Sequence, residues 1–229
     1  MKVSIIVFPG SNCDRDCHHV MSRVLGQDAD YVFHKEKALP DTDLVILPGG
    51  FSYGDYLRSG AIARFSPIMD DVVRFAEKGG LVLGICNGFQ VLLEVGLLPG
   101  AMRPNRAGQF VCSDVFLKVD NRDTPLTRTV EEGRTLTIPV AHADGNYYAP
   151  PGVLQEIEDN GQVLFRYVDR KGRVRDSANP NGSMNSIAGV MNRQGNCFGM
   201  MPHPERASEA CLGSEDGKIL FDSLIQARG

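Results

Sequence analysis

The residue with the clearest chemical signal is Cys86, which lies in the segment Gly84-Ile85-Cys86-Asn87-Gly88. An apolar run over 81–85 precedes it and an apolar helical pattern up to Val95 follows it, the context of a nucleophile elbow. There the nucleophile occupies a strained turn, and the flanking glycines let strand and helix approach closely. The helix N-terminus favours a thiolate, and the Asn87 N–H faces an oxyanion. We therefore predict a nucleophile, although free cysteines are most often buried apolar residues.

A cysteine nucleophile needs a base, and His203 is the best candidate among the five histidines. It follows a predicted strand in the segment Met201-Pro202-His203-Pro204-Glu205-Arg206, where two prolines stiffen the loop. Glu205 can reach the second ring nitrogen and fix the tautomer, as the third member of a catalytic triad does. A histidine in such a loop is usually a surface residue. Together with the elbow, it predicts a triad of Cys86, His203 and Glu205.

An oxyanion hole needs a second backbone donor from an adjacent loop. The segment Pro48-Gly49-Gly50 ends a neighbouring predicted strand, and the absence of a side chain at Gly50 lets its N–H approach a substrate carbonyl. Taken alone, this segment would be an ordinary turn. With the elbow, it predicts that Gly50 and Asn87 supply the two donors.

The elements that must position these residues follow two patterns, one in each half of the chain. In the first half, β-branched and aliphatic runs alternate with amphipathic helical patterns, which predicts an α/β fold with a parallel sheet and helices on both faces. Beyond about residue 108 the strand patterns follow one another, before a final helix. We expect one domain over residues 1–229, with a mobile surface loop at 169–186. The predicted strands are 2–8, 44–47, 81–85, 110–119, 135–140, 163–168, 187–191 and 197–201, and the predicted helices are 13–25, 67–76, 87–95 and 216–226.

Composition excludes several classes of protein. Hydrophobic residues make up 42% and charged residues 23%, which argues against a disordered chain, a collagen or a coiled coil. A net charge of -4 gives no reason to expect nucleic acid or an anionic membrane as the main partner. The apolar runs are too short for a membrane span or a secretory signal, so we expect a cytoplasmic protein.

The six cysteines show no paired framework, so we expect free thiols. Cys112 and Cys197 lie in predicted strands. Cys13 and Cys17 lie on the apolar face of a predicted helix, and their spacing with the adjacent histidines matches no standard zinc pattern. We predict no metal site.

Taken together, these motifs resemble those of the class I, or triad, glutamine amidotransferases. The more specific pieces are GGFSYGD and CNGFQ, which narrow the resemblance to the glutaminase subunits that serve an ATP-dependent synthetase of purine biosynthesis. The segments that carry it are FPGSNCD from Phe8, PGGFSYGDYLRSGAIARFS from Pro48, LGICNGFQVLLEVGLLPGAM from Leu83, PVAHADGN from Pro139 and GMMPHPER from Gly199.

The resemblance implies a flavodoxin-like fold with a mostly parallel central sheet and an additional antiparallel β portion in the second half. It also implies that Cys86 attacks the side-chain amide of L-glutamine, that His203 protonates the ammonia and activates water, and that Glu205 orients His203. Gln90, one helical turn beyond the nucleophile, matches the family position that contacts bound glutamine. Further candidates for substrate or partner contact are Asn105, Arg106 and His142.

The partners are likewise implied by the resemblance. A synthetase subunit would bind ATP and Mg²⁺ and receive the ammonia inside a complex that includes a second, small subunit, while this chain would hold no cofactor. Two other interpretations remain open. One is an independent cysteine hydrolase or chaperone of the DJ-1/PfpI kind, which usually lacks the His-Pro-Glu segment; the other is a catalytically inactive binding module, against which the intact triad argues.

Overall fold

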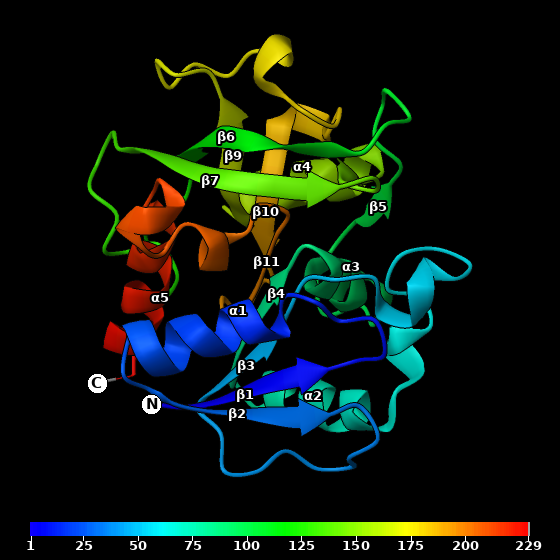
Figure 1. Cartoon of the computed structure of the whole chain (residues 1–229). Coiled ribbons are helices and arrows are strands. Elements are labelled where there is room, and N and C mark those ends of the chain that lie inside the picture. The colour runs from blue at the N-terminus through cyan, green and yellow to red at the C-terminus, as the bar shows by residue number, and fades with distance from the viewer. Residues whose placement is uncertain (229) are drawn as a thin grey trace.

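One continuous sheet organises residues 1–228, the part of the chain that the computed structural model describes (Figure 1). Parallel strands form one half and antiparallel strands the other, as the resemblance implied. The parallel strands, in spatial order, are β2 (Asp28–Phe33), β1 (Lys2–Val7), β3 (Leu44–Leu47), β4 (Leu81–Ile85) and β11 (Cys197–Met200). The antiparallel strands continue the order with β10 (Ile187–Met191), β9 (Val163–Val168), β6 (Val111–Val119) and β7 (Thr135–His142).

Helices cover both faces of the parallel half. The helices are α1 (Asp14–His19), which continues as a π-helical turn over Val20–Val24, α2 (Pro67–Glu77), α3 (Asn87–Glu94), α4 (Pro151–Asp159) and α5 (Asp216–Gln226). Figure 1 shows α1 in front of the parallel strands and α2 behind them, while α3 packs on β3, β4 and β11. The C-terminal helix α5 packs against β7. None of the helices within residues 1–228 is long and apolar enough to cross a membrane.

The burial of each strand follows its place in the sheet. Every residue of β3 and β4 is buried, because helices cover both sides of these central strands. Along β7, half-buried and buried residues alternate, because one face of the antiparallel half is open. The continuous apolar runs of β3 and β4 and the alternating pattern of β7 in the sequence follow from this difference in burial.

The predicted strands and helices are present, with ends that differ by one or two residues in most cases. Two further elements were not predicted: β2, a partly exposed edge strand with polar residues, and α4, a nine-residue helix with one buried residue, Ile157. A small antiparallel pair, β5 (Ala101–Arg103) with β8 (Asn146–Tyr148), was also not predicted, since three residues are too few for a periodic signal.

The prediction of a mobile surface loop at 169–186 is wrong for its second part. Asn181 and Ser183 are only 1% and 3% exposed. The Ser183 hydroxyl accepts the Tyr147 N–H at 3.0 Å, and the Asn181 amide donates to the Tyr167 hydroxyl at 3.2 Å. A polar composition predicted exposure, whereas these side chains satisfy buried polar groups of the core.

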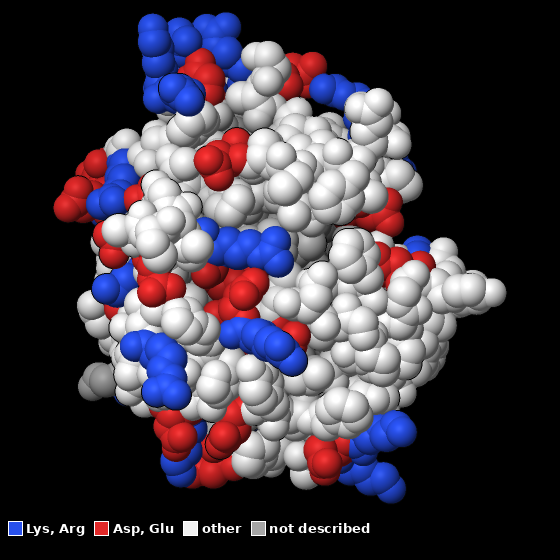
Figure 2. Space-filling model, in the orientation of Figure 1, with Lys and Arg blue, Asp and Glu red and all other residues white. Residues whose placement is uncertain are grey.

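The first part of this loop carries a cluster of exposed cations. Figure 2 shows basic side chains gathered at the top of the view, over the loop that follows β9. Elsewhere on the face shown, acidic and basic side chains are interspersed. The basic residues of the loop are Arg170, Lys171, Arg173 and Arg175.

A close approach between α3 and β3 fixes the position of the elbow. A Cβ on Gly88, the second residue of α3, would overlap the carbonyl oxygen of Leu47 in β3. Neither backbone segment has room to move, because both are buried in the core. Glycine at this position is therefore a steric requirement of the fold.

Gly88→Ala should lower the free energy of unfolding by about 3 kcal/mol or more, because the added methyl group meets a buried backbone atom. Gly152→Ala in α4 is the matched control, since nothing lies within 4 Å of its added Cβ. This control should be neutral or stabilising by up to about 1 kcal/mol, as alanine favours helix. Urea unfolding followed by circular dichroism measures both, and equal midpoints for the two variants would contradict the steric argument.

Candidate active site

Cys86 adopts the strained turn that the sequence predicted. Its φ and ψ are 50° and −106°, a conformation that L-residues rarely adopt, and its N–H donates to the Met200 carbonyl at 2.8 Å. The side chain is 5% exposed, and its Sγ lies 3.7 Å from the Ala141 carbonyl oxygen. A Cβ on Gly84 would lie 2.6 Å from the Leu92 side chain, so both flanking glycines have the predicted steric purpose.

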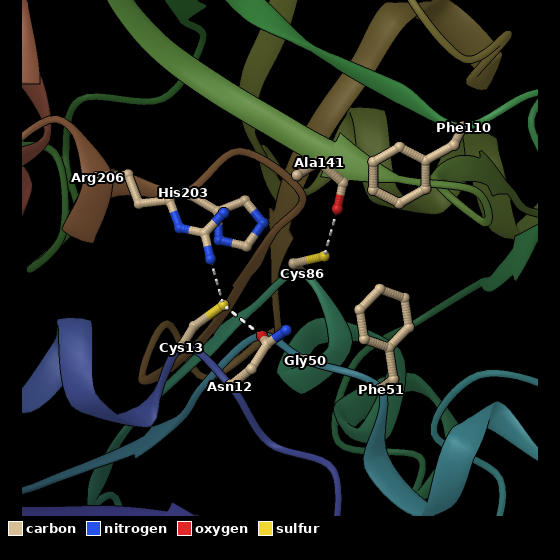
Figure 3. A pocket seen from close by; sticks show the side chains of 9 residues that line it. All are labelled: Asn12, Cys13, Gly50, Phe51, Cys86, Phe110, Ala141, His203 and Arg206. Carbon is tan, nitrogen blue, oxygen red and sulfur yellow. Dashed lines mark hydrogen bonds between the residues drawn. The ribbon is translucent and has the colours of Figure 1, made fainter.

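A pocket of about 130 Å³ lies beside the Cys86 thiol (Figure 3). Its walls come from segments far apart in the sequence, which meet because the carboxyl ends of β1, β3, β4 and β11 lie at the same edge of the sheet. The end of β7 and the residue before β6 close the opposite side. The lining residues are Asn12, Cys13, Gly50, Phe51, Cys86, Phe110, Ala141, His203 and Arg206.

His203 and Glu205 form a buried hydrogen-bonded pair at the wall of this pocket. The His203 Nδ1 and a Glu205 carboxylate oxygen are 2.6 Å apart, and each residue is 2% exposed. The backbone N–H of His203 donates to the Pro139 carbonyl at 2.8 Å, which ties the loop that contains His203 to β7. Nε2 of His203 has no hydrogen-bond partner within residues 1–228. The structure therefore places the ring with one nitrogen fixed and the other free.

The two buried histidines near Cys86 have opposite electrostatic environments. Burial alone would lower the pKa of His203, but the charges of Glu205 and Cys86 outweigh it and hold this pKa well above its ordinary value. Burial lowers the pKa of His142 to about 4, and the neighbouring His203 adds to this shift. One imidazole is thus stabilised as a cation and the other as a neutral ring.

The two predicted oxyanion donors are both available. Gly50 has a φ of +148°, and its added Cβ would lie 2.8 Å from the Gly10 carbonyl oxygen, so only glycine fits. Hydrogen bonds from Asn12 to Gly49 and from Phe51 to Gly10 flank it, and its own N–H donates to no group within residues 1–228. The N–H of Asn87 belongs to the first turn of α3, where no intrahelical acceptor exists.

Gln90 lies in a second, smaller cavity that also contains the Cys86 thiol. Its side-chain N–H donates to the Asp144 carbonyl at 2.6 Å, and its side-chain oxygen accepts from Asn87 at 2.8 Å. His142 lines the same cavity. Both residues are placed where substrate contact is geometrically possible.

Asn105 and Arg106 lie outside both cavities. The Asn105 oxygen accepts the Gly145 N–H at 2.9 Å and lies 3.1 Å from the His142 Nδ1. Asn105 therefore positions the loop after β7. Arg106 is exposed and pairs with Asp176 at 3.1 Å. Substrate contact, predicted for these two residues from the resemblance, has no support in this geometry.

The sequence pattern assigned Cys13 to an apolar helix face, and this interpretation is incomplete. Its Sγ lines the Cys86 pocket, accepts from the Arg206 guanidinium at 3.0 Å and donates to Asn12 at 3.1 Å (Figure 3). Burial raises the pKa of the Cys13 thiol, with a partly opposing contribution from His203. Its position at the end of the loop between β1 and α1, at the same sheet edge as the elbow, was the signal that could have revealed this.

Cys13, His203 and Glu205 are also the one set of three metal-ligating side chains that converge within the described residues. Their ligand atoms lie within 4.8 Å of one another. Sulfur, nitrogen and oxygen donors of this kind suit Zn²⁺. The His203 Nδ1 is already bonded to a Glu205 carboxylate oxygen. The absence of a metal site remains a prediction.

Comparisons with known proteins agree on one family. A family model for CobB/CobQ-like glutamine amidotransferase domains matches residues 1–217. The phosphoribosylformylglycinamidine synthase subunit PurQ of Salinibacter ruber is 58% identical over 224 residues, which cover 98% of this chain and 95% of the relative. PurQ of Moorella thermoacetica is 57% identical over 225 residues, again with 98% and 95% covered.

Solved structures give the same result. A chain in the structure of PurLQS from Thermotoga maritima matches 100% of this chain and 99% of its own length, with a TM-score of 0.89 and 45% identity. A glutamine amidotransferase of Thermotoga maritima matches with a TM-score of 0.59 at 18% identity, over 100% of this chain and 85% of its own, which shows a shared fold alone. The predicted class I glutamine amidotransferase fold is confirmed. This chain belongs to the family of CobB/CobQ-like glutamine amidotransferases.

Proposed function

We propose that this chain hydrolyses L-glutamine to glutamate and ammonia as the glutaminase subunit of phosphoribosylformylglycinamidine synthase. The observation that carries the proposal is the pocket that the strained Cys86 shares with His203, whose ring is bonded to the buried Glu205, in a chain 58% identical to a PurQ protein. Cys86, His203 and Glu205 act as the catalytic triad, and Gly50 and Asn87 as the oxyanion donors.

In the first half-reaction the Cys86 thiolate attacks the side-chain amide carbon of glutamine. The Gly50 and Asn87 N–H groups stabilise the oxyanion of the tetrahedral intermediate. His203, held by Glu205 and protonated, gives its proton to the departing nitrogen. The carbon–nitrogen bond breaks, ammonia leaves, and a γ-glutamyl thioester remains on Cys86.

In the second half-reaction a water molecule attacks the thioester. His203, now neutral, accepts a proton from this water, and the carbon–sulfur bond breaks to give glutamate and the Cys86 thiolate. The proton on His203 restores the starting state. Gln90, with its side chain already bonded to Asn87 and Asp144, and His142 line the place that glutamine occupies.

The ammonia serves a partner rather than solvent. The chain works with the synthetase subunit PurL and the small subunit PurS, and ammonia converts formylglycinamide ribonucleotide to its amidine on PurL. We place ATP and Mg²⁺ on PurL and the complex in the cytoplasm. Ammonia released into water at neutral pH becomes mostly ammonium, which is not a nucleophile. Transfer inside a complex avoids this loss.

An independent hydrolase or chaperone of the DJ-1/PfpI kind is not favoured. The family match extends over residues 1–217, and the PurQ relatives match over nearly the whole chain. A catalytically inactive module is not favoured either, because a thiol and an imidazole line one pocket and a buried carboxylate is bonded to that imidazole.

Cys86→Ser should abolish glutamine-dependent synthesis by the reconstituted complex, since a hydroxyl at this position is a far weaker nucleophile. Synthesis from added ammonium salt should keep the wild-type rate, because that reaction bypasses this chain. Both rates are measured as formation of the amidine product. Parallel loss of both activities would assign Cys86 a structural role.

His203→Ala should lower glutaminase kcat by a factor of about 10³ or more, because it removes the group that transfers the proton. Glu205→Gln should cost less, since the amide can still orient the ring while the charge is lost. Steady-state glutamate release by the complex compares the two variants. If Glu205→Gln were the more damaging change, the two roles would be misassigned.

The opposite pKa shifts of the two histidines predict different titrations. His203 should keep its second ring proton above pH 6.5, whereas His142 should stay neutral down to about pH 4. The contribution of His203 to stability is therefore complete below pH 6.5 and is lost as the pH rises through its folded pKa. The contribution of His142 to stability is complete above pH 6.5 and is lost as the pH falls towards 4.

NMR of the imidazole nitrogens against pH measures both groups. Glu205→Gln removes the charge that contributes most to raising the pKa of His203. The pKa of His203 should therefore fall in this variant, while the pKa of His142 should change little. A wild-type His203 that loses its proton below pH 6.5 would contradict the electrostatic argument.

A further inference from the structure

The loop that follows Gly50 has a strained backbone. Tyr53 and Asp55 have φ values of 54° and 53°, and Leu57 has a φ of 71°, although none of the three is a glycine. L-residues rarely adopt this left-handed region, and such strain persists only where surrounding contacts hold it in place. Only Gly50 of the motif GGFSYGD, which spans residues 49–55, takes part in the proposed reaction. The contacts of the strained residues indicate what the rest of the motif does.

Two backbone contacts attach this loop to the elements that carry the active site. The Tyr53 N–H donates to the Pro9 carbonyl, in the loop after β1, at 2.6 Å. The Ser52 N–H donates to the side-chain oxygen of Asn87, at the start of α3, at 3.1 Å. Only two residues separate Gly50 from Tyr53, so the orientation of the Gly50 peptide depends on how Tyr53 is held.

The hydroxyl of Tyr53 supplies a third anchor. It lies 2.7 Å from Nδ1 of His34, directly after β2, and 2.9 Å from the hydroxyl of Ser66, the residue before α2. A phenol hydroxyl donates one hydrogen bond and accepts others, so both contacts can form together. His34 and Ser66 are both buried, so water competes little for these bonds. The loop is therefore fastened to β2 and α2, two elements that contribute no residue to either cavity beside Cys86.

These hydroxyls serve neither the substrate cavity nor the helix start. Tyr53 lines neither of the two cavities that contain the Cys86 thiol. Its ring packs against the hydrophobic core and edge-on to the His34 ring, with 5.6 Å between the centroids. The Ser66 side chain makes no capping hydrogen bond to α2, and Tyr53 is the partner of its hydroxyl within residues 1–228. The contact between the two hydroxyls thus acts on the loop.

We propose that Tyr53 is a positioning residue for the oxyanion hole, whose hydroxyl keeps the strained loop in the conformation that presents the Gly50 N–H. This inference rests on the proposed function and adds to it a residue that acts without touching the substrate. Without the hydroxyl, the left-handed turn at Tyr53 can relax, and the Gly50 peptide can rotate with it. An oxyanion donor stabilises the transition state more than bound glutamine, so a misplaced donor lowers kcat and leaves KM nearly unchanged.

Tyr53→Phe removes the hydroxyl and keeps the ring. In the reconstituted complex it should lower kcat for glutamate release by about tenfold and change KM by less than about twofold. Alkylation of Cys86 by iodoacetamide should keep the wild-type rate, because displacement at a methylene carbon needs the thiolate and develops no oxyanion. Mass spectrometry of the peptide that contains Cys86 measures this rate. Tyr31→Phe in β2 is the matched control and should change none of the three values, since the Tyr31 hydroxyl has no hydrogen-bond partner within residues 1–228.

Ser66→Ala removes one partner of the Tyr53 hydroxyl and should lower kcat by about threefold, again at an unchanged alkylation rate. It takes the place of Tyr53→Phe should that variant not assemble. An unchanged kcat would overturn the inference, as would a loss that appears in KM alone. Parallel losses of kcat and of alkylation would show a general disturbance of the site and overturn it too. A wild-type complex that hydrolyses no glutamine would overturn the proposed function itself, which is a different result.

Discussion

The approach of α3 to β3 and β4 is the constraint on which the site depends. Gly88 lies so close to the Leu47 carbonyl that no side chain fits, and a Cβ on Gly84 would lie 2.7 Å from the Gly88 carbonyl in α3. The chain between them has no room for a relaxed turn, so Cys86 takes a φ of 50°. This strain lifts the thiol out of the sheet edge and points the first N–H groups of α3 towards the same space. The positions of the proposed nucleophile Cys86 and of the proposed oxyanion donor Asn87 are thus both products of this packing contact.

The charge of each buried imidazole in the site depends on the charged groups beside it. Burial alone would favour a neutral imidazole, yet the charges of Glu205, 2.6 Å away, and of Cys86 hold the pKa of His203 well above its ordinary value. His142 has no carboxylate bonded to its ring and is neutral. The charge of each imidazole is thus set by its neighbours in the fold.

Much of this could be predicted from the sequence for physical reasons that are local. Strand periodicity reports burial, which for β3 and β4 depends only on being central. The elbow could be predicted because glycine on both sides of a reactive residue, between a strand and a helix, is the pattern that a strained turn requires. Edge strand β2 and the three-residue strands β5 and β8 lack such signals, since their pairing depends on neighbours rather than on their own pattern. The segment 179–186 was wrongly predicted to be a surface loop because polar side chains that satisfy buried groups have the same composition as an exposed loop.

By itself, the sequence determined the alternation of strands and helices, the strained Cys86 and the pairing of His203 with Glu205, because each follows from residues within a few positions of one another. Only the tertiary structure decided what surrounds them. Ala141 of β7 approaches the Cys86 thiol although β7 is the last strand at the far end of the sheet. Cys13 and Gly50 lie beside Cys86 because the order of strands brings the ends of β1 and β3 to the same edge as that of β4. That order is set by long-range packing, which no local pattern encodes.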